Sequence, residues 1–371
     1  MLLINGTFAQ ITTQPTSKPT TAPILREITS LRGPGGEFVK YSSDGSRLVT
    51  GSSTAFEEAS FRVWKTANFK EIPDLIMHRD LKRVDITSDG SKVLSVAYRQ
   101  ENKDKGWETT SGEAILWDCD TGRQLLPPIT HKTKMLQDAA LSLDGMWIAT
   151  AGNDDVVRVW SAKTGTAVFK VDLGLPISTV QFNRSGSQII AHGDRIVAVI
   201  DVKTGKVQHK WTGDLLQFQR FPPKLNQDGK LIAASEMYHV RVYDADSGKE
   251  VTDISVSIGD SAAVFGIGMS RDGKYFATTG FGYGGGAIWE IATGKMVFSD
   301  NDVALGGDAE FSPDGRLICF MDYGLWDIAL RSRVELPKDI GWSRAKTFSP
   351  DGKFLVIGVY NETCVYEIVG K

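Results

Sequence analysis

The sequence predicts an all-β fold in which one small antiparallel sheet is repeated eight times. Three observations support this prediction. An Asp-Gly dipeptide, replaced once by Ser-Gly, returns at regular intervals along the 371 residues. A strand rich in β-branched residues follows each dipeptide and ends, in all repeats but one, in an aromatic residue. Glycine (38) and tryptophan (9) are frequent, which suits many short strands joined by tight turns.

The stretch Leu141–Gly165 shows the repeating unit most completely. Asp144-Gly145 supplies the positive φ that a tight hairpin requires. A short apolar strand, Trp147–Ala149, precedes a polar turn, and the β-branched strand Val156–Trp160 follows that turn. Thr164-Gly165 then turns the chain again. The stretch therefore predicts three edges of a small antiparallel sheet.

Three columns of residues run in step through the chain. The dipeptides begin at positions 44, 89, 144, 185, 228, 272, 314 and 351, so the gaps range from 37 (314 to 351) to 55 (89 to 144). The second column, often a hydroxyl residue, is Thr50, Ser95, Thr150, Ala191, Ala234, Thr278, Phe320 and Ile357. The third is Trp64, Trp117, Trp160, Ile200, Tyr243, Trp289, Trp326 and Tyr366. This spacing is close to the roughly 40–45 residues of a four-stranded propeller blade. We therefore predict eight blades, because a seven-bladed ring would leave one complete set of columns unused.

Short motifs repeat at the same places in these units. They are FSPDG at 311–315 and 348–352, VRVW at 157–160, ILWD at 115–118 and LWD at 325–327. On these motifs the chain resembles the WD40-repeat β-propeller family over about residues 24–371. The resemblance implies a ring of four-stranded antiparallel blades. It implies little about activity, because function belongs to sites rather than to folds.

The strand order predicts how the ring closes. Each repeat supplies three strands and then an outer fourth strand, but the chain ends four residues after Glu367, so the eighth repeat lacks an outer strand. The segment Ile24–Leu31 precedes the first inner strand and is spare. If it pairs with the strand that ends at Tyr366, the ring closes and two exposed edges disappear.

The resemblance also implies a His–Ser/Thr–Asp–Trp hydrogen-bond network in some blades. The second repeat keeps His78, Ser95 and Trp117, and later repeats lack the histidine and often the hydroxyl. We therefore expect apolar packing to hold most blades, with one or two also held by this network. The blade with the complete set should be the most rigid one. That set is His131, Thr150, Asp154 and Trp160.

The first 23 residues differ in composition from the rest. Gln10–Pro23 is rich in threonine and proline and cannot bury a core, so we expect residues 1–23 to form a disordered tail. The preceding residues Met1–Ala9 resemble the end of a secretory signal peptide, with a small-residue cleavage site after Ala9. The alternative is an ordinary frayed terminus. A cytoplasmic and an exported location both remain open.

Insertions between the second and third strands of a blade, the b–c loops, indicate a binding face. The hydroxyl and aromatic columns are 14 residues apart in repeat 1 (50 to 64) and 22 in repeat 2 (95 to 117). Repeat 6 carries a glycine-rich aromatic loop, residues 280–286. Insertions on one face often mark where a repeat protein binds, although they can also be neutral extensions. We predict partner-binding residues Phe56, Glu57, Glu58, Trp107, Phe281 and Tyr283.

No catalytic or metal-binding pattern is present in the sequence. Cys119, Cys319 and Cys364 share no close spacing, and neither HExxH nor Gly-x-Ser-x-Gly occurs. We therefore predict no catalytic residue, no metal and no cofactor. The net charge of −3 indicates no nucleic-acid partner, and no apolar run is long enough to span a membrane.

Two functional hypotheses follow. The first is a non-catalytic scaffold that is monomeric on its own and binds a protein or peptide. The second is an enzyme or cofactor-binding propeller similar to quinoprotein-like dehydrogenases or propeller lactonases. In the second case acids or histidines should meet at one mouth of the central channel, and Asp85, Asp138 and Glu310 are scattered candidates. An apolar or Ser/Thr-lined channel would favour the scaffold.

Overall fold

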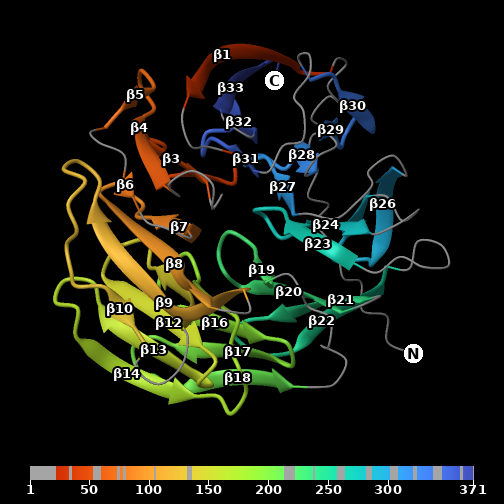
Figure 1. Ribbon diagram of the computed structural model, residues 1–371. Coiled ribbons are helices and arrows are strands. Elements are labelled where there is room, and N and C mark those ends of the chain that lie inside the picture. The colour runs from red at the N-terminus through yellow and green to blue at the C-terminus, as the bar shows by residue number, and fades with distance from the viewer. Residues whose placement is uncertain are drawn as a thin grey trace, which may run out of the picture.

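The strands form a closed ring of eight antiparallel sheets, as the sequence predicted (Figure 1). Seven of these sheets have four strands and one has five, within the residues described below. The computed structural model describes residues 22–32, 36–52, 60–72, 76–77, 81–103, 106–131, 136–212, 222–236, 239–256, 264–280, 286–300, 308–320, 324–336, 345–359 and 362–370. The described part of the chain is thus an eight-bladed β-propeller, and each blade is numbered here by its place in the sequence.

The two inner strands of each blade, a and b, form the wall of the central channel. In blades 1 to 8, strand a is β2 (Phe38–Tyr41), β7 (Leu81–Ile86), β11 (Leu136–Leu141), β15 (Thr179–Phe182), β19 (Lys224–Leu225), β23 (Val264–Met269), β27 (Ala309–Phe311) and β31 (Ala345–Phe348). Strand b is β3 (Arg47–Ser52), β8 (Lys92–Lys103), β12 (Trp147–Gly152), β16 (Gln188–Gly193), β20 (Leu231–Glu236), β24 (Tyr275–Gly280), β28 (Leu317–Phe320) and β32 (Phe354–Val359).

The two outer strands, c and d, complete each blade. Strand c is β4 (Ser60–Lys65), β9 (Gly106–Asp118), β13 (Val156–Ser161), β17 (Ile196–Asp201), β21 (His239–Asp244), β25 (Gly286–Glu290), β29 (Gly324–Asp327) and β33 (Glu362–Val369). In blade 1 the outer position is shared by β5 (Lys70–Glu71) and β6 (Ile76–Met77), which both pair with β4. In blades 2 to 8, strand d is β10 (Ile129–Thr130), β14 (Ala167–Asp172), β18 (Val207–Thr212), β22 (Glu250–Ser255), β26 (Lys295–Asp300), β30 (Ser332–Val334) and β1 (Ile24–Arg32).

The eight dipeptides form the a–b turns. Their glycines all have φ between 66° and 75°, the left-handed region that a Cβ disfavours. The aspartate holds the same turn: Oδ1 of Asp44 accepts the Ser42 hydroxyl at 2.6 Å and the backbone N–H of Ser46 at 2.9 Å. These acids therefore have a structural role in the turns.

The apolar core lies between neighbouring blades. One buried cluster joins blades 3 and 4, with Val157 of β13 packed in the same group as Ile189 of β16. Another joins blades 8 and 1 through Leu48, Trp64 and Val365. Because each blade buries both faces against its neighbours, the sheets depend on ring closure for their burial.

The N-terminal strand closes the ring, in agreement with the sequence prediction. β1 pairs antiparallel with β33 from Ile24↔Val369 to Arg32↔Glu362. The first described strand is therefore the outer strand of the last blade, and it covers the outer edge of β33.

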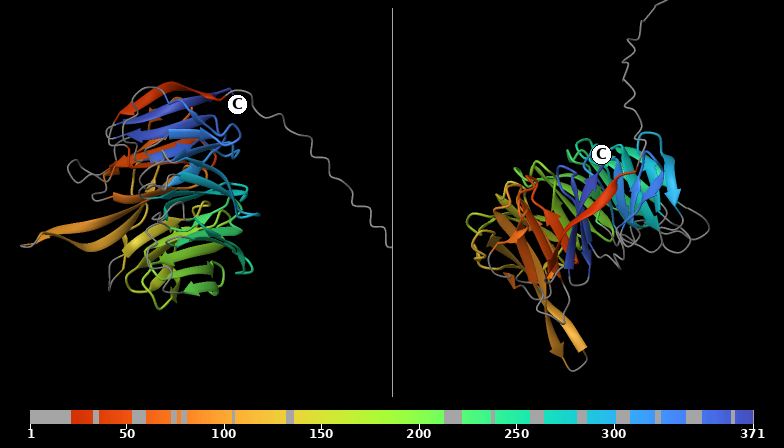
Figure 2. Two further views of the ribbon diagram at one scale, coloured as in Figure 1. Left: turned by 90° about the vertical axis from the view of Figure 1, so that its right-hand side faces the viewer. Right: turned by 90° about the horizontal axis from the view of Figure 1, so that it is seen from above.

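A long hairpin projects from one face of the ring (Figure 2). Strands β8 and β9 of blade 2 continue their pairing to Lys103↔Gly106. Strand β7 pairs with β8 only as far as Ala97, and β10 pairs with β9 only at Glu113 and Ala114. Beyond these positions the hairpin is two-stranded in the described part of the chain.

Candidate functional site

The projecting hairpin lies where the sequence placed the insertion of repeat 2. Arg99 pairs with Ser111 and Asn102 pairs with Trp107, so the insertion lengthens both strands instead of forming an irregular loop. Of the predicted partner-binding residues, Trp107 is therefore placed by its backbone, near the tip of the hairpin. The others, Phe56, Glu57, Glu58, Phe281 and Tyr283, lie outside the described residues.

One mouth of the channel opens on the same face as the b–c loops. In each blade the start of strand a pairs with the end of strand b, as in Phe38↔Gly51 of blade 1. Side chains near the start of the inner strands therefore surround the channel on the face from which the hairpin projects. This mouth carries several charged groups that the sequence analysis did not select: Lys40, Lys82, Arg83, Lys224, Asp308 and Lys346.

On the side of blades 2 to 4, Arg83 of β7 joins three blades. Its guanidinium is 2.7 Å from Oδ2 of Asp138 in blade 3 and 3.0 Å from Oδ2 of Asp85 in its own blade. It also donates to the carbonyl of Val180 in blade 4 at 2.9 Å. Both carboxylates are nearly inaccessible, with 6% of the Asp85 side chain and 2% of the Asp138 side chain exposed.

The acids that the sequence analysis named as channel candidates share a structural role. Asp85 accepts the backbone N–H of Leu141 at 3.2 Å, and Asp138 accepts that of Val180 at 3.1 Å. Glu310 is 3.4 Å from the N–H of Phe348. In each case the acid belongs to one inner strand and the N–H to the inner strand of the next blade. Strand a is the inner edge of each sheet, so these bonds satisfy backbone groups that would otherwise be unpaired.

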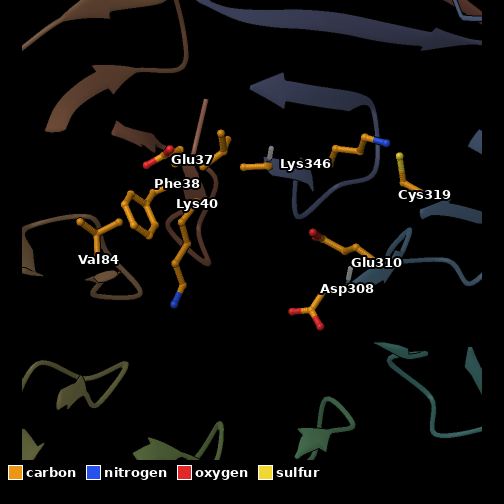
Figure 3. A pocket seen from close by; sticks show the side chains of 10 residues that line it. Glu37, Phe38, Lys40, Val84, Asp308, Glu310, Cys319 and Lys346 are labelled. Carbon is orange, nitrogen blue, oxygen red and sulfur yellow. The ribbon is translucent and has the colours of Figure 1, made fainter. Parts of the chain in front are cut away.

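On the opposite side, a cavity of about 260 Å³ lies beside blade 8 (Figure 3). Figure 3 shows the carboxylates of Asp308 and Glu310 lying near each other, while the Lys346 side chain reaches toward Cys319. Asp308 is 2.6 Å from Nζ of Lys224, a residue of blade 5. The Thr347 hydroxyl donates to Glu310 at 3.0 Å. The lining residues are Glu37, Phe38, Val39, Lys40, Val84, Asp308, Glu310, Cys319, Ala345 and Lys346.

The buried acids of the channel differ in electrostatics: burial raises the pKa of Asp138, and the charges of Arg83 and Lys82 only partly oppose this. Burial opposes ionisation of Asp85, but the charges of Arg83 and Lys40 outweigh it and hold its pKa below the ordinary range. Burial raises the pKa of Glu310 to about 7, and the hydrogen bonds from Thr347 and Phe348 and the charge of Lys224 only partly oppose this. Glu310 is therefore a carboxyl that titrates near neutral pH.

The predicted network of blade 3 comes together in the structure. Thr150 Oγ1 is 2.9 Å from both His131 Nε2 and Trp160 Nε1. Asp154 is 3.3 Å from His131 Nδ1 and 2.7 Å from Arg158. Burial, followed by the charge of Arg158, lowers the pKa of His131, so the imidazole is neutral at neutral pH.

The hydrogen bond between tryptophan and a hydroxyl occurs in more blades than the complete network does. Trp64, Trp117 and Trp289 donate from Nε1 to Thr50, Ser95 and Thr278 at 2.9, 2.7 and 3.1 Å. Blades 1, 2 and 6 thus keep this bond, and the polar component is broader than the sequence analysis expected. His78 lies outside the described residues.

The channel matches neither pattern that would separate the two hypotheses. It is lined by paired charges rather than by apolar or Ser/Thr side chains, and its acids are divided between two sides. Among the described residues, no three His, Cys, Asp or Glu side chains are grouped so as to hold a metal ion. The three cysteines are buried, and burial raises the pKa of each thiol. No helix in the described part is long and apolar enough to cross a membrane.

Comparison with known proteins gives related propellers. The U3 small nucleolar RNA-associated protein 15 homolog of Gallus gallus is 27% identical over 57% of this chain and 38% of its own. Eukaryotic translation initiation factor 3 subunit I of Neosartorya fischeri is 26% identical over 54% and 60%. The serine-threonine kinase receptor-associated protein of Gallus gallus is 22% identical over 67% and 65%. These matches span less than two thirds of each relative's own length.

The fold comparison and the family comparison agree with each other. The β-propeller domain of Cps50 (Swd1) from Myceliophteria thermophila superposes with a TM-score of 0.61 at 12% identity, over 93% of this chain and all of that one. The family described as WD domain, G-beta repeat matches residues 125–161, which contain the outer strand of blade 2 and strands a to c of blade 3. This match, within an eight-bladed ring built from one repeating unit, confirms the predicted resemblance to WD40-repeat β-propellers.

Proposed function

We propose that this protein is a non-catalytic scaffold that binds a protein or peptide partner on the face carrying the b–c loops of blades 1, 2 and 6. The observation that carries the proposal is the β8–β9 hairpin, which extends from this face and whose two edges beyond Ala97 and Glu113 pair with no other strand among the described residues. A two-stranded hairpin is only marginally stable in water, and free edges are templates for pairing with another chain. A partner on this face would stabilise it.

The sequence of the hairpin suits an interface. Trp107 lies among charged residues in RQENKDKGWETTSG, residues 99–112. Aromatic anchors surrounded by polar residues are the usual composition of protein-binding surfaces. The names of two relatives, an initiation-factor subunit and a kinase receptor-associated protein, describe proteins that act with other proteins, which supports the same kind of role here.

Paired substitutions on the two faces test the proposal. Trp107→Ala with Phe281→Ala removes two aromatic side chains from the proposed face. The matched control is Leu125→Ala with Met146→Ala, because these apolar side chains are 42% and 56% exposed near turns of the opposite face. Affinity capture from the native source, quantified by mass spectrometry, should show a partner that the first variant loses and the control keeps. Equal recovery with both variants would contradict the assignment of this face.

A further inference from the structure

The cavity beside blade 8 has unused capacity to accept hydrogen bonds. Each ammonium group around it already has an acceptor: Lys40 pairs with Asp85, Lys346 donates to the Phe320 carbonyl, and Lys224 pairs with Asp308. The carboxylates are less fully paired. Oδ1 of Asp308 is buried and has no hydrogen-bond donor among the described residues.

The position of this oxygen distinguishes it from other buried acceptors. Oδ1 of Asp138 also lacks a donor among the described residues, but its side chain is 2% exposed, is ion-paired with Arg83 and does not line the cavity. The Asp308 side chain is 44% exposed and does line it. The Asp308 carboxyl thus lines a space that a ligand can enter, and one of its two oxygens has no donor among the described residues.

Glu310 adds a second carboxyl to this space. Figure 3 shows its side chain and that of Asp308 close to each other, and the two acids come from positions 308 and 310 of blade 7. Its Oε1 accepts the Thr347 hydroxyl, which fixes the orientation of the carboxyl. An entering cation would therefore meet two carboxylates: Asp308, which pairs with Lys224, and Glu310, whose donors are the Thr347 hydroxyl and the Phe348 N–H.

We propose that this cavity binds one guanidinium or ammonium group, placed between Asp308 and Glu310. A positively charged donor can hydrogen-bond to both carboxylates, whereas these carboxylates would repel an anion. A cavity of about 260 Å³ holds a group of the size of one side chain and is smaller than most pockets for drug-sized ligands. Phe38 and Val84 supply apolar lining for the aliphatic part.

The group can come from two sources. The cavity opens on the proposed partner face, so an arginine or lysine side chain of a partner is one source. A small free amine is the other. The site itself does not rest on the proposed function, because a small probe reports binding without any partner.

Binding should depend on pH through Glu310. Its titratable neighbours are Asp308 on the same blade, Lys224 of β19, Cys319 of β28, Lys346 of β31 and Lys40 of β2. Arg271 also acts on it electrostatically. Burial raises the pKa of Glu310 to about 7, so this carboxyl changes its charge between pH 6 and pH 8. A cation prefers the ionised carboxylate, so affinity should rise about tenfold from pH 6 to pH 8.

Calorimetric titration with N-propylguanidinium tests the site, and its neutral isostere N-propylurea serves as the ligand control. We expect saturable binding of the cation with a Kd of about 1 mM or lower at pH 8, and none of the urea. Asp308→Asn with Glu310→Gln should abolish binding. Asp194→Asn, which removes an exposed carboxylate from the b–c turn of blade 4 on the same face, should retain it.

Three results would overturn the proposal: no saturable binding by the wild-type protein, equal binding of cation and urea, or full binding by the double variant. If the double variant has a lowered unfolding midpoint, Glu310→Gln alone replaces it and should remove the pH dependence. Competition between the probe and a captured partner assigns the site to a partner side chain. Probe binding without competition assigns it to a small amine, and in that case the site stands even if the proposed partner face fails.

Discussion

The two sides of the channel use the same strand positions and the same kinds of residue, but with different results. On the side of blades 2 to 4, Arg83 lies between the carboxylates of Asp85 and Asp138, and both are nearly inaccessible. On the side of blades 7 to 1, Asp308 pairs with Lys224, Glu310 accepts from Thr347 and Phe348, and a cavity remains beside them.

This difference gives the first side a structural role and the second side a proposed role in ligand binding. A guanidinium offers five donors in a fixed fork, so Arg83 can bridge two carboxylates and a carbonyl at once. A lysine ammonium is a single point of charge, and Lys224 pairs with one carboxylate, Asp308, while the donors to Glu310 are neutral groups, the Thr347 hydroxyl and the Phe348 N–H. The first arrangement holds blades together, and the second keeps capacity for a ligand.

The largest expected loss of unfolding free energy comes from removing Arg83, the guanidinium between Asp85 and Asp138. Arg83→Met leaves two buried carboxylates without their common cation, and losing one partner of a buried ion pair costs about 3–5 kcal/mol. Equilibrium urea unfolding should show this loss. A change below about 1 kcal/mol would mean that the carboxylates re-pair or take up protons at little cost, and the two sides would then be equivalent.

A substitution in the hydrogen-bond network of blade 3 should cause a smaller loss of unfolding free energy and leave the channel unchanged. Asp154→Ala removes the carboxylate that orients His131 and pairs with Arg158, which should cost about 1–3 kcal/mol of unfolding free energy. The same variant should bind N-propylguanidinium as the wild-type protein does. Weakened probe binding in a folded variant would show that the channel and the outer network are coupled.

Glu310 and Asp85 should contribute to the pH dependence of stability with opposite signs. Glu310 has a folded pKa of about 7, above the value near 4.5 in the unfolded chain, so its contribution is complete below pH 4.5 and is lost as the pH rises to 7. The unfolding free energy of Glu310→Gln should therefore gain about 2–3 kcal/mol on that of the wild type between pH 5 and pH 8. Asp85, whose pKa is lowered, acts in the opposite direction and weakens the fold in acid. Chemical unfolding at the two pH values measures the difference, and parallel curves for wild type and variant would contradict it.

The smallest effect should come from the lysine of the cavity side. Lys224→Met removes one partner of a pair whose carboxylate is 44% exposed, so we expect a change of about 0–1 kcal/mol. It matches Arg83→Met in the charge removed and in the side chain introduced. A loss as large as that of Arg83→Met would remove the distinction between the two sides.

The sequence predicted the ring well because its signals are local and repeated. The Asp-Gly dipeptides mark the a–b turns, and the spare segment Ile24–Leu31 indicated the closing strand, which the structure places at Ile24–Arg32. The position of the insertion in repeat 2 was predicted correctly, but its conformation as two paired strands was not. Alternation in Arg99–Gly112 is weak, so nothing in the sequence showed that it would continue the β8–β9 ladder.

The channel charges were missed because their meaning depends on neighbouring blades. Asp85, Asp138 and Glu310 were noticed singly, as scattered acids. Their partners Arg83 and Lys224 were not, since an isolated basic residue in a short strand resembles any solvent-facing one. The signal that was present is a charged residue within an otherwise apolar inner strand, as in LKRVDI at 81–86. Only the ring brings Lys224 of blade 5 to Asp308 of blade 7.

Photo-crosslinking from the hairpin tests the central claim most directly. A photoreactive amino acid in place of Trp107 probes the b–c face, and the same residue in place of Met146 probes an exposed site on the opposite face. The proposed function predicts a specific protein adduct from position 107 in the native source and none from position 146. Adducts from position 146 alone, or none from either position, would contradict the account of this face as the partner-binding surface.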